Sequence, residues 1–204
     1  MDFLKKEGFE IKMLPAWRPD KAMAVENPTV FRAYVEKLGQ TADVNIVVFD
    51  DLITALRKRH DFFSEMGCKL SDHGIEEFYA EDYTENEIKT IFNKVYSGKE
   101  LTKEEILKFK SAMMVEMAIM DYQKGWAQQL HYGAIRNNNS RMYAQLGPDT
   151  GFDSIGDWPV AQPLARLLDR LDQSGHLAKT ILYNINPKAF AKRFMQFFAD
   201  HFFT

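Results

Sequence analysis

The chain has 204 residues, of which 46% are hydrophobic, 13% aromatic and 27% charged, and its formal net charge at pH 7 is -3. So many apolar side chains exclude a disordered, collagen-like or low-complexity chain, and the length falls short of the roughly 250 residues of a complete eight-stranded α/β barrel. Since the 26 basic residues are matched by 29 acidic ones and form no basic cluster, we expect no nucleic-acid partner.

Along the chain, short apolar stretches of strand length alternate with longer stretches whose apolar residues recur every three or four positions. The predicted strands are Phe9–Leu14, Cys68–Ser71, Trp126–Leu130 and Thr180–Ile185. The predicted helices are Thr29–Leu38, Asp50–Glu65, Glu85–Tyr96, Lys103–Lys124 and Val160–Asp172. A strand, a helix and a strand in succession imply parallel pairing through right-handed crossovers, so the pattern predicts one α/β layer system.

Two of the predicted helices begin with a capping box. Thr84 stands three positions before Glu87, and Thr102 stands three positions before Glu105. In this motif each side chain satisfies a backbone N–H group that the first helical turn leaves free. We therefore expect helices to begin directly after Thr84 and Thr102.

The location of the protein follows from its cysteine content and its first residues. Cys68 is the only cysteine, so no intramolecular disulfide can form, and a reducing compartment suits the chain. The first residues carry charges where a signal peptide is apolar, and no stretch approaches the roughly 18 apolar residues of a membrane-spanning helix. We expect a cytoplasmic protein without a membrane partner.

Polar side chains follow each predicted strand. The carboxyl ends of parallel strands build the site in α/β proteins, so these side chains are candidates for function. They include Trp17, Arg18, Asp72, His73, His131, Arg136 and Asn137. Guanidinium groups bind carboxylates through paired hydrogen bonds, amides bind hydroxyls, and a histidine can transfer a proton or bind a metal. The pattern predicts a composite polar site that suits a sugar-like substrate.

The charged candidates also have structural interpretations. His131 can be a histidine at a strand end whose hydrogen bonds are satisfied. Asp72 can cap a helix, with His73 as a surface imidazole after it. Arg18 can pair on the surface with a nearby acid such as Asp20. From the residues alone, both interpretations stay open for each position.

Two further features have mainly structural interpretations. The asparagines at 137–139 suit a turn that tolerates left-handed backbone conformations. Cys68 begins a predicted buried strand, which favours an inert core thiol over a nucleophile. The sequence contains no phosphate loop, no Ser-His-Asp order and no His-Glu-x-x-His motif.

Five longer segments together resemble one family. They are Phe9–Ala22, Gly67–His73, Trp126–Asn139, Leu146–Ile155 and Lys179–Pro187. In this order they are similar to the uronate isomerases, also called glucuronate isomerases. The resemblance extends over residues 9–187 without a large gap, which makes it far more specific than any single short motif.

The resemblance implies a distorted (β/α)8 barrel of the TIM type, in the amidohydrolase superfamily. This chain would supply about four parallel strand-helix units, with the third to sixth strands and extra helices. The implied reaction is an isomerisation in hexuronate catabolism that converts D-glucuronate to D-fructuronate and D-galacturonate to D-tagaturonate. A base removes the proton at C2, an enediolate forms, and the proton returns to C1, while a divalent metal, usually zinc, stabilises the negative charge.

The resemblance also implies roles for individual residues. The family histidine that matches His131 faces the active site, so His131 is the candidate catalytic residue. The arginine that matches Arg18 suits the uronate carboxylate. The candidate substrate-binding residues are Arg18, Trp17, Asp72, His73, Arg136 and Asn137.

The sequence departs from the family pattern in three respects. The His-x-His pair that supplies metal ligands has no counterpart, nor has the Thr-Asp-Ser-Arg segment whose aspartate is a metal ligand and the candidate base. The family pattern is also lost after Pro187. We therefore expect a central barrel segment at residues 1–187, a divergent Phe-rich helical tail at residues 188–204, and no zinc bound by this chain alone.

Three hypotheses follow. The first is a uronate isomerase sequence that represents the central part of the barrel and has little activity by itself. The alternative is a catalytically inactive half-barrel that self-associates through exposed strand edges or pairs with a complementary fragment. A metal-dependent hydrolase of the same superfamily is disfavoured, because the five segments match the isomerase so closely.

Overall fold

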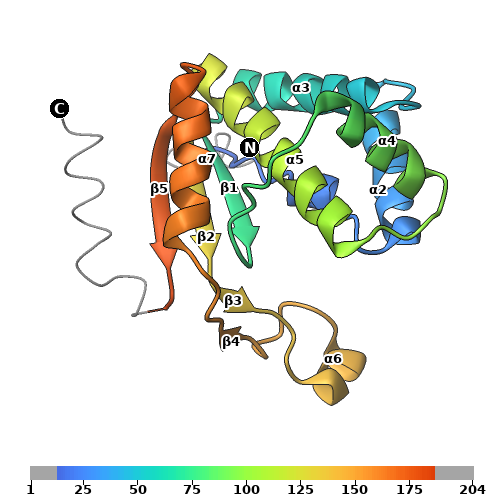
Figure 1. Cartoon of the computed structure of the whole chain (residues 1–204), viewed down its shortest axis with the longest axis vertical. Coiled ribbons are helices and arrows are strands. Elements are labelled where there is room, and N and C mark those ends of the chain that lie inside the picture. Colours follow the sequence, from blue (N-terminus) through green and yellow to red (C-terminus); the bar gives the residue numbers. More distant parts are fainter. Residues whose placement is uncertain (1–12, 187–204) are drawn as a thin grey trace, which may run out of the picture.

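Residues 13–186 are described by a computed structural model, in which a small parallel sheet packs against a layer of helices (Figure 1). The sheet contains β1 (Leu70–Ile75), β2 (Ala127–Tyr132) and β5 (Lys179–Asn184), in the order β1-β2-β5 and with both pairs parallel. The prediction of an α/β system with parallel strands is therefore confirmed.

The first predicted strand lies mostly outside the described residues, since only Met13 and Leu14 fall within them, and these two form no strand. The chain that follows runs beside β1. Trp17 forms a parallel bridge with Ser71, and the Asp72 N–H donates to the Trp17 carbonyl at 2.9 Å. This segment occupies the place of a further parallel strand next to β1.

Helices form the second layer. They are the short 3-10 helix η1 (Asp20–Met23) and the α-helices α2 (Pro28–Ala42), α3 (Phe49–Glu65), α4 (Glu85–Tyr96), α5 (Lys103–Lys124) and α7 (Ala161–Gln173). Helix α5 contacts β2 as well as α3, α4 and α7, so it joins the sheet to the outer helices. Four phenylalanines lie at the centre of this layer, with ring centroids 5.9 to 6.2 Å apart and edge-to-face orientations: Phe31, Phe49, Phe92 and Phe109.

The two capping boxes are confirmed. The Thr84 hydroxyl accepts from the Glu87 N–H at 3.3 Å, and the Thr102 N–H donates to the Glu105 carboxylate at 2.7 Å. Both helices begin and end at the predicted residues.

The predicted ends of two strands are wrong. Strand β1 continues to Ile75 and β2 continues to Tyr132, so Asp72, His73 and His131 lie within strands rather than after them. The physical reason is that backbone pairing between β1 and β2 continues through these polar positions. Side chains along both strands alternate between a buried face and a less buried face, which lets polar residues occupy the second face.

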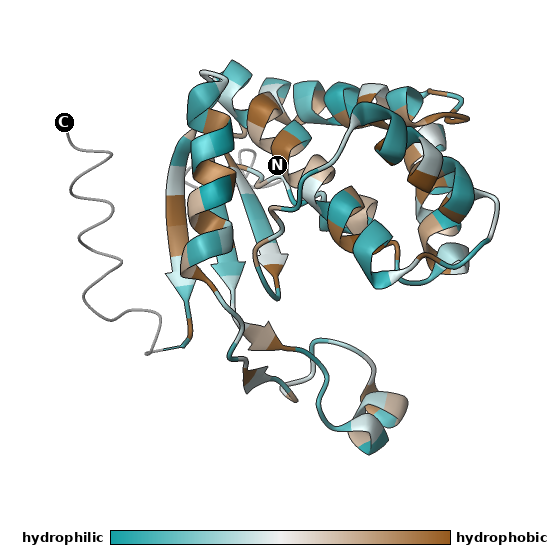
Figure 2. Cartoon of the chain, viewed as in Figure 1, coloured by the Kyte–Doolittle hydropathy of each residue, from teal (hydrophilic) through white to brown (hydrophobic). Residues whose placement is uncertain are grey.

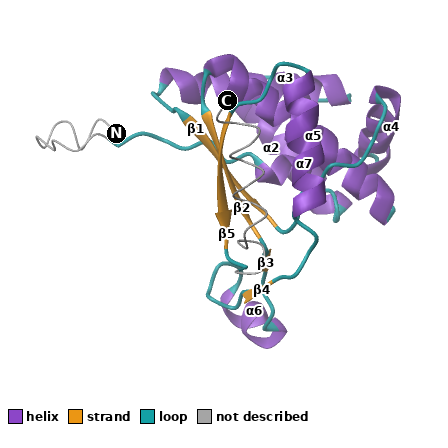
Figure 3. Ribbon diagram, turned by 60° about the vertical axis from the view of Figure 1, so that its left-hand side comes forward, coloured by secondary structure: helices purple, strands orange, loops and turns teal. Residues whose placement is uncertain are grey.

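The main sheet therefore has two unlike faces. One face packs against the helices, and Figure 3 shows these helices gathered on one side of the strands. The other, which we call the open face, carries the alternate residues of each strand. They are Leu70, Asp72 and Gly74 from β1, Ala127, Gln129 and His131 from β2, and Lys179, Ile181 and Tyr183 from β5.

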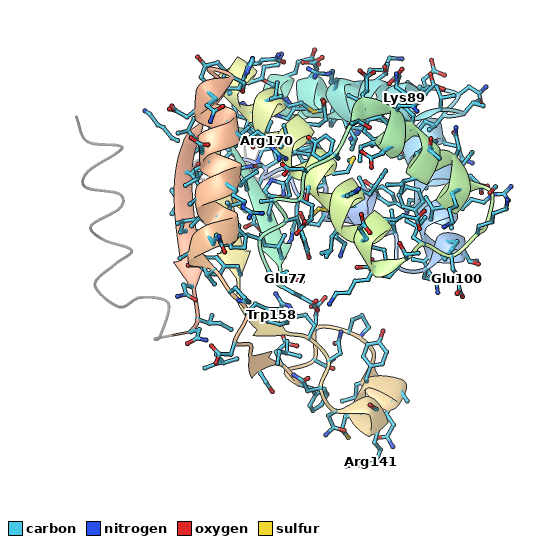
Figure 4. All side chains as sticks on the ribbon, in the orientation of Figure 1. Glu77, Lys89, Glu100, Arg141, Trp158 and Arg170 are labelled. Carbon is cyan, nitrogen blue, oxygen red and sulfur yellow. The ribbon has the colours of Figure 1, made fainter. Side chains whose placement is uncertain are left out.

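The segment between β2 and α7, which we call the excursion, was not predicted to contain helices or strands. It contains β3 (Ala134–Ile135), α6 (Ser140–Leu146) and β4 (Ser154–Ile155), with β3 and β4 paired antiparallel. Figure 2 shows it projecting from the carboxyl end of the sheet, and Figure 4 marks Arg141 at its far end. Helix α6 has no buried residue, so sequence periodicity gives no signal for it.

Among residues 13–186, no helix combines the length and the apolar character that crossing a membrane would require.

Candidate functional site

The candidate site lies at the carboxyl end of the open face. The last aligned row of open-face residues contains Gly74, His131 and Tyr183, and the row before it begins with Asp72. Because the strands are parallel, side chains from successive strand-helix units meet at this end. We call His131, Asp72 and Arg18 the open-face cluster.

His131 is held on two sides. Its Nε2 atom lies 2.9 Å from Oδ1 of Asp72, and its ring stacks on Tyr183 with centroids 4.2 Å apart and planes inclined by 4°. The side chain keeps 43% of its surface exposed. This histidine is oriented by its neighbours and still accessible to a ligand.

Asp72 connects His131 to Arg18. Its Oδ2 atom lies 3.3 Å from Nη1 of Arg18, and the carboxylate is 22% exposed while the arginine is 53% exposed. The interpretation of Asp72 as a helix cap is wrong, because the residue lies inside β1. The chain thus places a carboxylate between a histidine and an arginine.

Asp20 supports this cluster from η1, although it is not among the predicted site residues. Its carboxylate accepts from the Gly74 N–H at 2.8 Å and lies 2.8 Å from Nδ1 of His73. It also lies 3.4 Å from Nε of Arg18, so the predicted surface pair is present. Asp20 anchors the chain around Arg18 to the end of β1.

The ionisation of Asp20 reflects these partners. Burial, the largest single effect, would by itself raise the pKa of its carboxyl, whereas the hydrogen bond and charge of His73 lower that pKa. The Gly74 N–H and Arg18 act in the same direction. The pKa of Asp20 therefore lies below its usual value, and the residue is a carboxylate at neutral pH.

Arg136 and Asn137 follow β3 and are held by Asp153. Nη1 of Arg136 lies 2.6 Å from the Asp153 carboxylate, which also accepts from the Asn137 N–H at 3.0 Å. The bond from the Asn137 amide is the largest effect that lowers the pKa of Asp153. Asn137 has a φ of 56°, which confirms the left-handed turn expected in the asparagine run.

Gly74 brings the two arginines close together. A Cβ atom at this position would clash with Nη2 of Arg18 and would lie 3.8 Å from Nη2 of Arg136. The absence of a side chain at 74 therefore leaves room for both guanidinium groups at the end of β1.

Two predicted site residues lie elsewhere. The Trp17 ring is buried and packs edge-on against His60 at 4.7 Å. The His73 imidazole is fully buried on the helix side of β1 against Asp20, so the interpretation of His73 as a surface imidazole is wrong. The structure brings Arg18, Asp72, His131 and Arg136 to the open end of the sheet and leaves Trp17 and His73 beneath it.

The residues present do not fit a metal site by themselves. Within the described part of the chain, no group of three or more histidine, cysteine, aspartate or glutamate side chains could hold a metal ion. Such a site needs several ligands at defined positions. Zinc thus has no coordination set among residues 13–186 and is a prediction of the family resemblance alone.

The arrangement can bind an anion and move a proton. Two arginines supply guanidinium groups suited to a carboxylate, and His131 supplies an imidazole, a group that can both accept and donate a proton. Asp72 lies next to the imidazole, where it stabilises a positive charge on that ring. These are the groups that a small hydroxylated acid requires for binding and proton transfer.

One known family has a model that covers nearly the whole chain. A family model described as glucuronate isomerase matches residues 2–202. The chain belongs to this family. The uronate isomerases of Bacteroides fragilis and Bacteroides thetaiotaomicron are 68% and 70% identical to it over 185 residues. The chain spans 40% of the length of these relatives.

Solved structures of the glucuronate isomerase family share the fold. The crystal structure of uronate isomerase from Thermotoga maritima matches 90% of this chain and 40% of its own, with a TM-score of 0.83 and 37% identity. Glucuronate isomerase from Caulobacter crescentus gives a TM-score of 0.82 at 27% identity, over 93% of this chain and 39% of its own. The prediction of a partial TIM-type barrel is thereby confirmed.

Proposed function

We propose that this protein functions as a uronate isomerase and interconverts D-glucuronate with D-fructuronate and D-galacturonate with D-tagaturonate. The observation that carries the proposal is family membership together with the open-face cluster at the carboxyl ends of β1 and β2. Neither relatives nor geometry favours hydrolysis, and self-association as a function of its own has no supporting observation.

The two arginines suit the carboxylate that distinguishes a uronate from a neutral sugar. Arg18 and Arg136 both approach the end of β1 at Gly74. Their side chains are 53% and 43% exposed, so each can exchange part of its contact with solvent for contact with a carboxylate. A bidentate arginine-carboxylate pair is among the stronger hydrogen-bonded contacts in proteins.

His131 suits the proton-transfer part of the reaction. Isomerisation removes a proton from C2 and delivers one to C1, and it also moves a proton between the two oxygens. A histidine that can both accept and donate a proton meets this requirement. The neighbouring Asp72 carboxylate favours the protonated ring that such a transfer creates.

We extend the proposal to features that the family resemblance implies. They are a role in hexuronate catabolism, residence in the cytoplasm and a dependence on a divalent metal such as zinc. Because the described residues contain no group of three or more side chains that could hold a metal ion, we assign no step of the reaction to the metal.

The test replaces the matching 185 residues of the Bacteroides fragilis uronate isomerase with those of this chain. We expect the chimera to convert D-glucuronate to D-fructuronate within about tenfold of the parental rate. In the same chimera, His131→Asn should lower turnover by about 100-fold or more, because proton transfer by a positioned side chain contributes roughly that factor.

The matched control is His176→Asn, since His176 lies in the loop before β5, at the opposite end of the sheet. This variant should keep the turnover of the unmodified chimera. A chimera that folds but does not convert D-glucuronate would overturn the proposed function.

A further inference from the structure

We infer that Asp72 is a positioning residue, which fixes His131 in the tautomer with its proton on Nε2 and holds Arg18 beside it. The catalytic consequence rests on the proposed function, whereas the tautomer is a property of this chain alone. The inference gives Asp72 a task different from direct contact with substrate.

The first observation is that the two carboxylate oxygens of Asp72 have different partners. Oδ1 lies 2.9 Å from Nε2 of His131, and Oδ2 lies 3.3 Å from Nη1 of Arg18. Arginine carries only donors, so Oδ2 is the oxygen that pairs with its positive charge. Oδ1 is then the oxygen that faces the imidazole.

The second observation concerns the proton between Asp72 and His131. Oδ1 is buried, and no N–H group of the described residues is well aligned with it. A carboxylate oxygen and an unprotonated ring nitrogen would repel each other at 2.9 Å, so Nε2 carries the proton. Catalytic hydrogen bonds are often poorly aligned before substrate binds and tighten in the complex.

The third observation is that the imidazole ring has a fixed plane. Tyr183 stacks on its face at 4.2 Å with an inclination of 4°. With Nε2 facing Asp72 and one face covered by Tyr183, the ring has little freedom to rotate. In a neutral ring held this way, Nδ1 is the nitrogen that can accept a proton.

These contacts give His131 the form that proton transfer requires. A neutral imidazole with its proton on Nε2 has a lone pair on Nδ1, and the adjacent carboxylate stabilises the imidazolium that forms when Nδ1 gains a proton. Because the same carboxylate holds Arg18, the proton carrier and the anion-binding group keep a fixed separation. Asp72 therefore positions two functional groups, one through each of its carboxylate oxygens.

The test is the substitution Asp72→Asn, which keeps the size of the side chain. Arg18 should retain the amide oxygen as its acceptor, so the amide NH2 group will face Nε2 of His131. Nε2 must then accept, and the proton should move to Nδ1. Long-range nitrogen-proton NMR correlations of the histidine-labelled chain should show an Nε2–H ring in the wild type and a predominantly Nδ1–H ring in the variant.

Asp153→Asn is the matched control, because it makes the same charge change next to Arg136 and does not contact His131. It should leave the tautomer of His131 unchanged. A wild-type ring protonated on Nδ1 overturns the inference without any variant. An unchanged tautomer in Asp72→Asn overturns it as well.

The catalytic consequence is tested in the chimera described above. Asp72→Asn should lower kcat by about 100-fold or more and change KM less than about threefold, because the wrong tautomer impairs chemistry rather than binding. A reversed tautomer with an unchanged kcat would overturn the positioning role in catalysis. An inactive parent chimera would overturn the proposed function and leave the tautomer result standing.

Discussion

Two aspartate-histidine pairs lie on opposite faces of the main sheet, and they differ mainly in exposure. On the helix side, Asp121 pairs with His60 at 3.1 Å and accepts a hydrogen bond from the Ser71 hydroxyl. The Asp121 side chain is 0% exposed and the His60 side chain is 2% exposed. On the open face, Asp72 pairs with His131 at 2.9 Å, with side chains 22% and 43% exposed.

An aspartate-histidine pair can therefore stabilise the fold when it is buried or belong to a binding site when it is exposed. His60 lies between the rings of Trp17 and Trp126, at 4.7 and 3.9 Å, so a ligand has no access to it. His131 has one face covered by Tyr183 and its Nε2 edge against Asp72, yet it keeps 43% of its side chain exposed. Ser71 and Asp72 are adjacent on β1, and side chains alternate between the two faces of a strand. Ser71 therefore contacts the buried pair on the helix side, whereas Asp72 belongs to the pair on the open face.

The largest expected effect is the difference in the free energy of unfolding between variants of Asp121 and of Asp72. Asp121→Ala should lower the free energy of unfolding by about 3–5 kcal/mol, because it leaves a buried histidine and a buried hydroxyl without their partner. Asp72→Ala should lower it by less than about 1 kcal/mol, since both partners reach solvent. Urea unfolding of the two variants checks this difference, and equal losses would contradict the structural role of the buried pair.

Gly39 and Gly74 differ in what an added Cβ atom would contact. A Cβ at Gly39 in α2 would lie 2.8 Å from the Val44 carbonyl oxygen, which is backbone and cannot move away. Gly39→Ala should therefore destabilise the chain by about 1–3 kcal/mol in urea unfolding.

In contrast, a Cβ at Gly74 would clash only with the flexible tip of Arg18. Gly74→Ala should change stability by less than about 1 kcal/mol. It should still raise KM for D-glucuronate about tenfold in the chimera, because it displaces a carboxylate-binding group. Unchanged KM would argue against a substrate role for Arg18.

A third, smaller effect is the pH dependence that Asp20 contributes. The folded pKa of Asp20 is lowered, so its stabilising contribution is present above the unfolded pKa and is lost as pH falls through the folded pKa. Between about pH 5 and about pH 3, the wild type should lose more stability than Asp20→Asn. Urea unfolding at several pH values measures this, and parallel curves would contradict the assigned partners.

The smallest expected effect lies in the excursion. Leu146 at the end of α6 is 56% exposed, so Leu146→Ala should change stability by no more than about 0.5 kcal/mol. Leu168 in α7 is 1% exposed, and Leu168→Ala is the matched control with an expected loss of about 2–5 kcal/mol. A large loss at Leu146 in urea unfolding would indicate that the excursion packs against other residues.

Local signals account for what the sequence predicted well. Helices α4 and α5 begin at the predicted residues, because their capping boxes act within the first turn. The predicted ends of β1 and β2 were less accurate. Asp72 and His73 do not resemble strand residues, and their partners Arg18 and Asp20 come from a distant part of the chain.

The position of the candidate site could be predicted from the sequence, but the contacts among its side chains could not. Parallel strands placed Arg18, Asp72 and His131 at one end of the sheet, as their positions after apolar stretches suggested. The supporting role of Asp20 depends on contacts across more than fifty residues, which spacing cannot show. The Phe-rich tail predicted at residues 188–204 lies outside the described residues.

The most direct test of the account is the turnover of D-glucuronate by three versions of the chimera. The unmodified chimera should be active, His131→Asn should lose about 100-fold or more, and His60→Asn should stay within about tenfold at a temperature where it is folded. Retained turnover in His131→Asn, in a chimera that is otherwise active, would contradict the claim that the open-face pair performs the function and the buried pair maintains the fold.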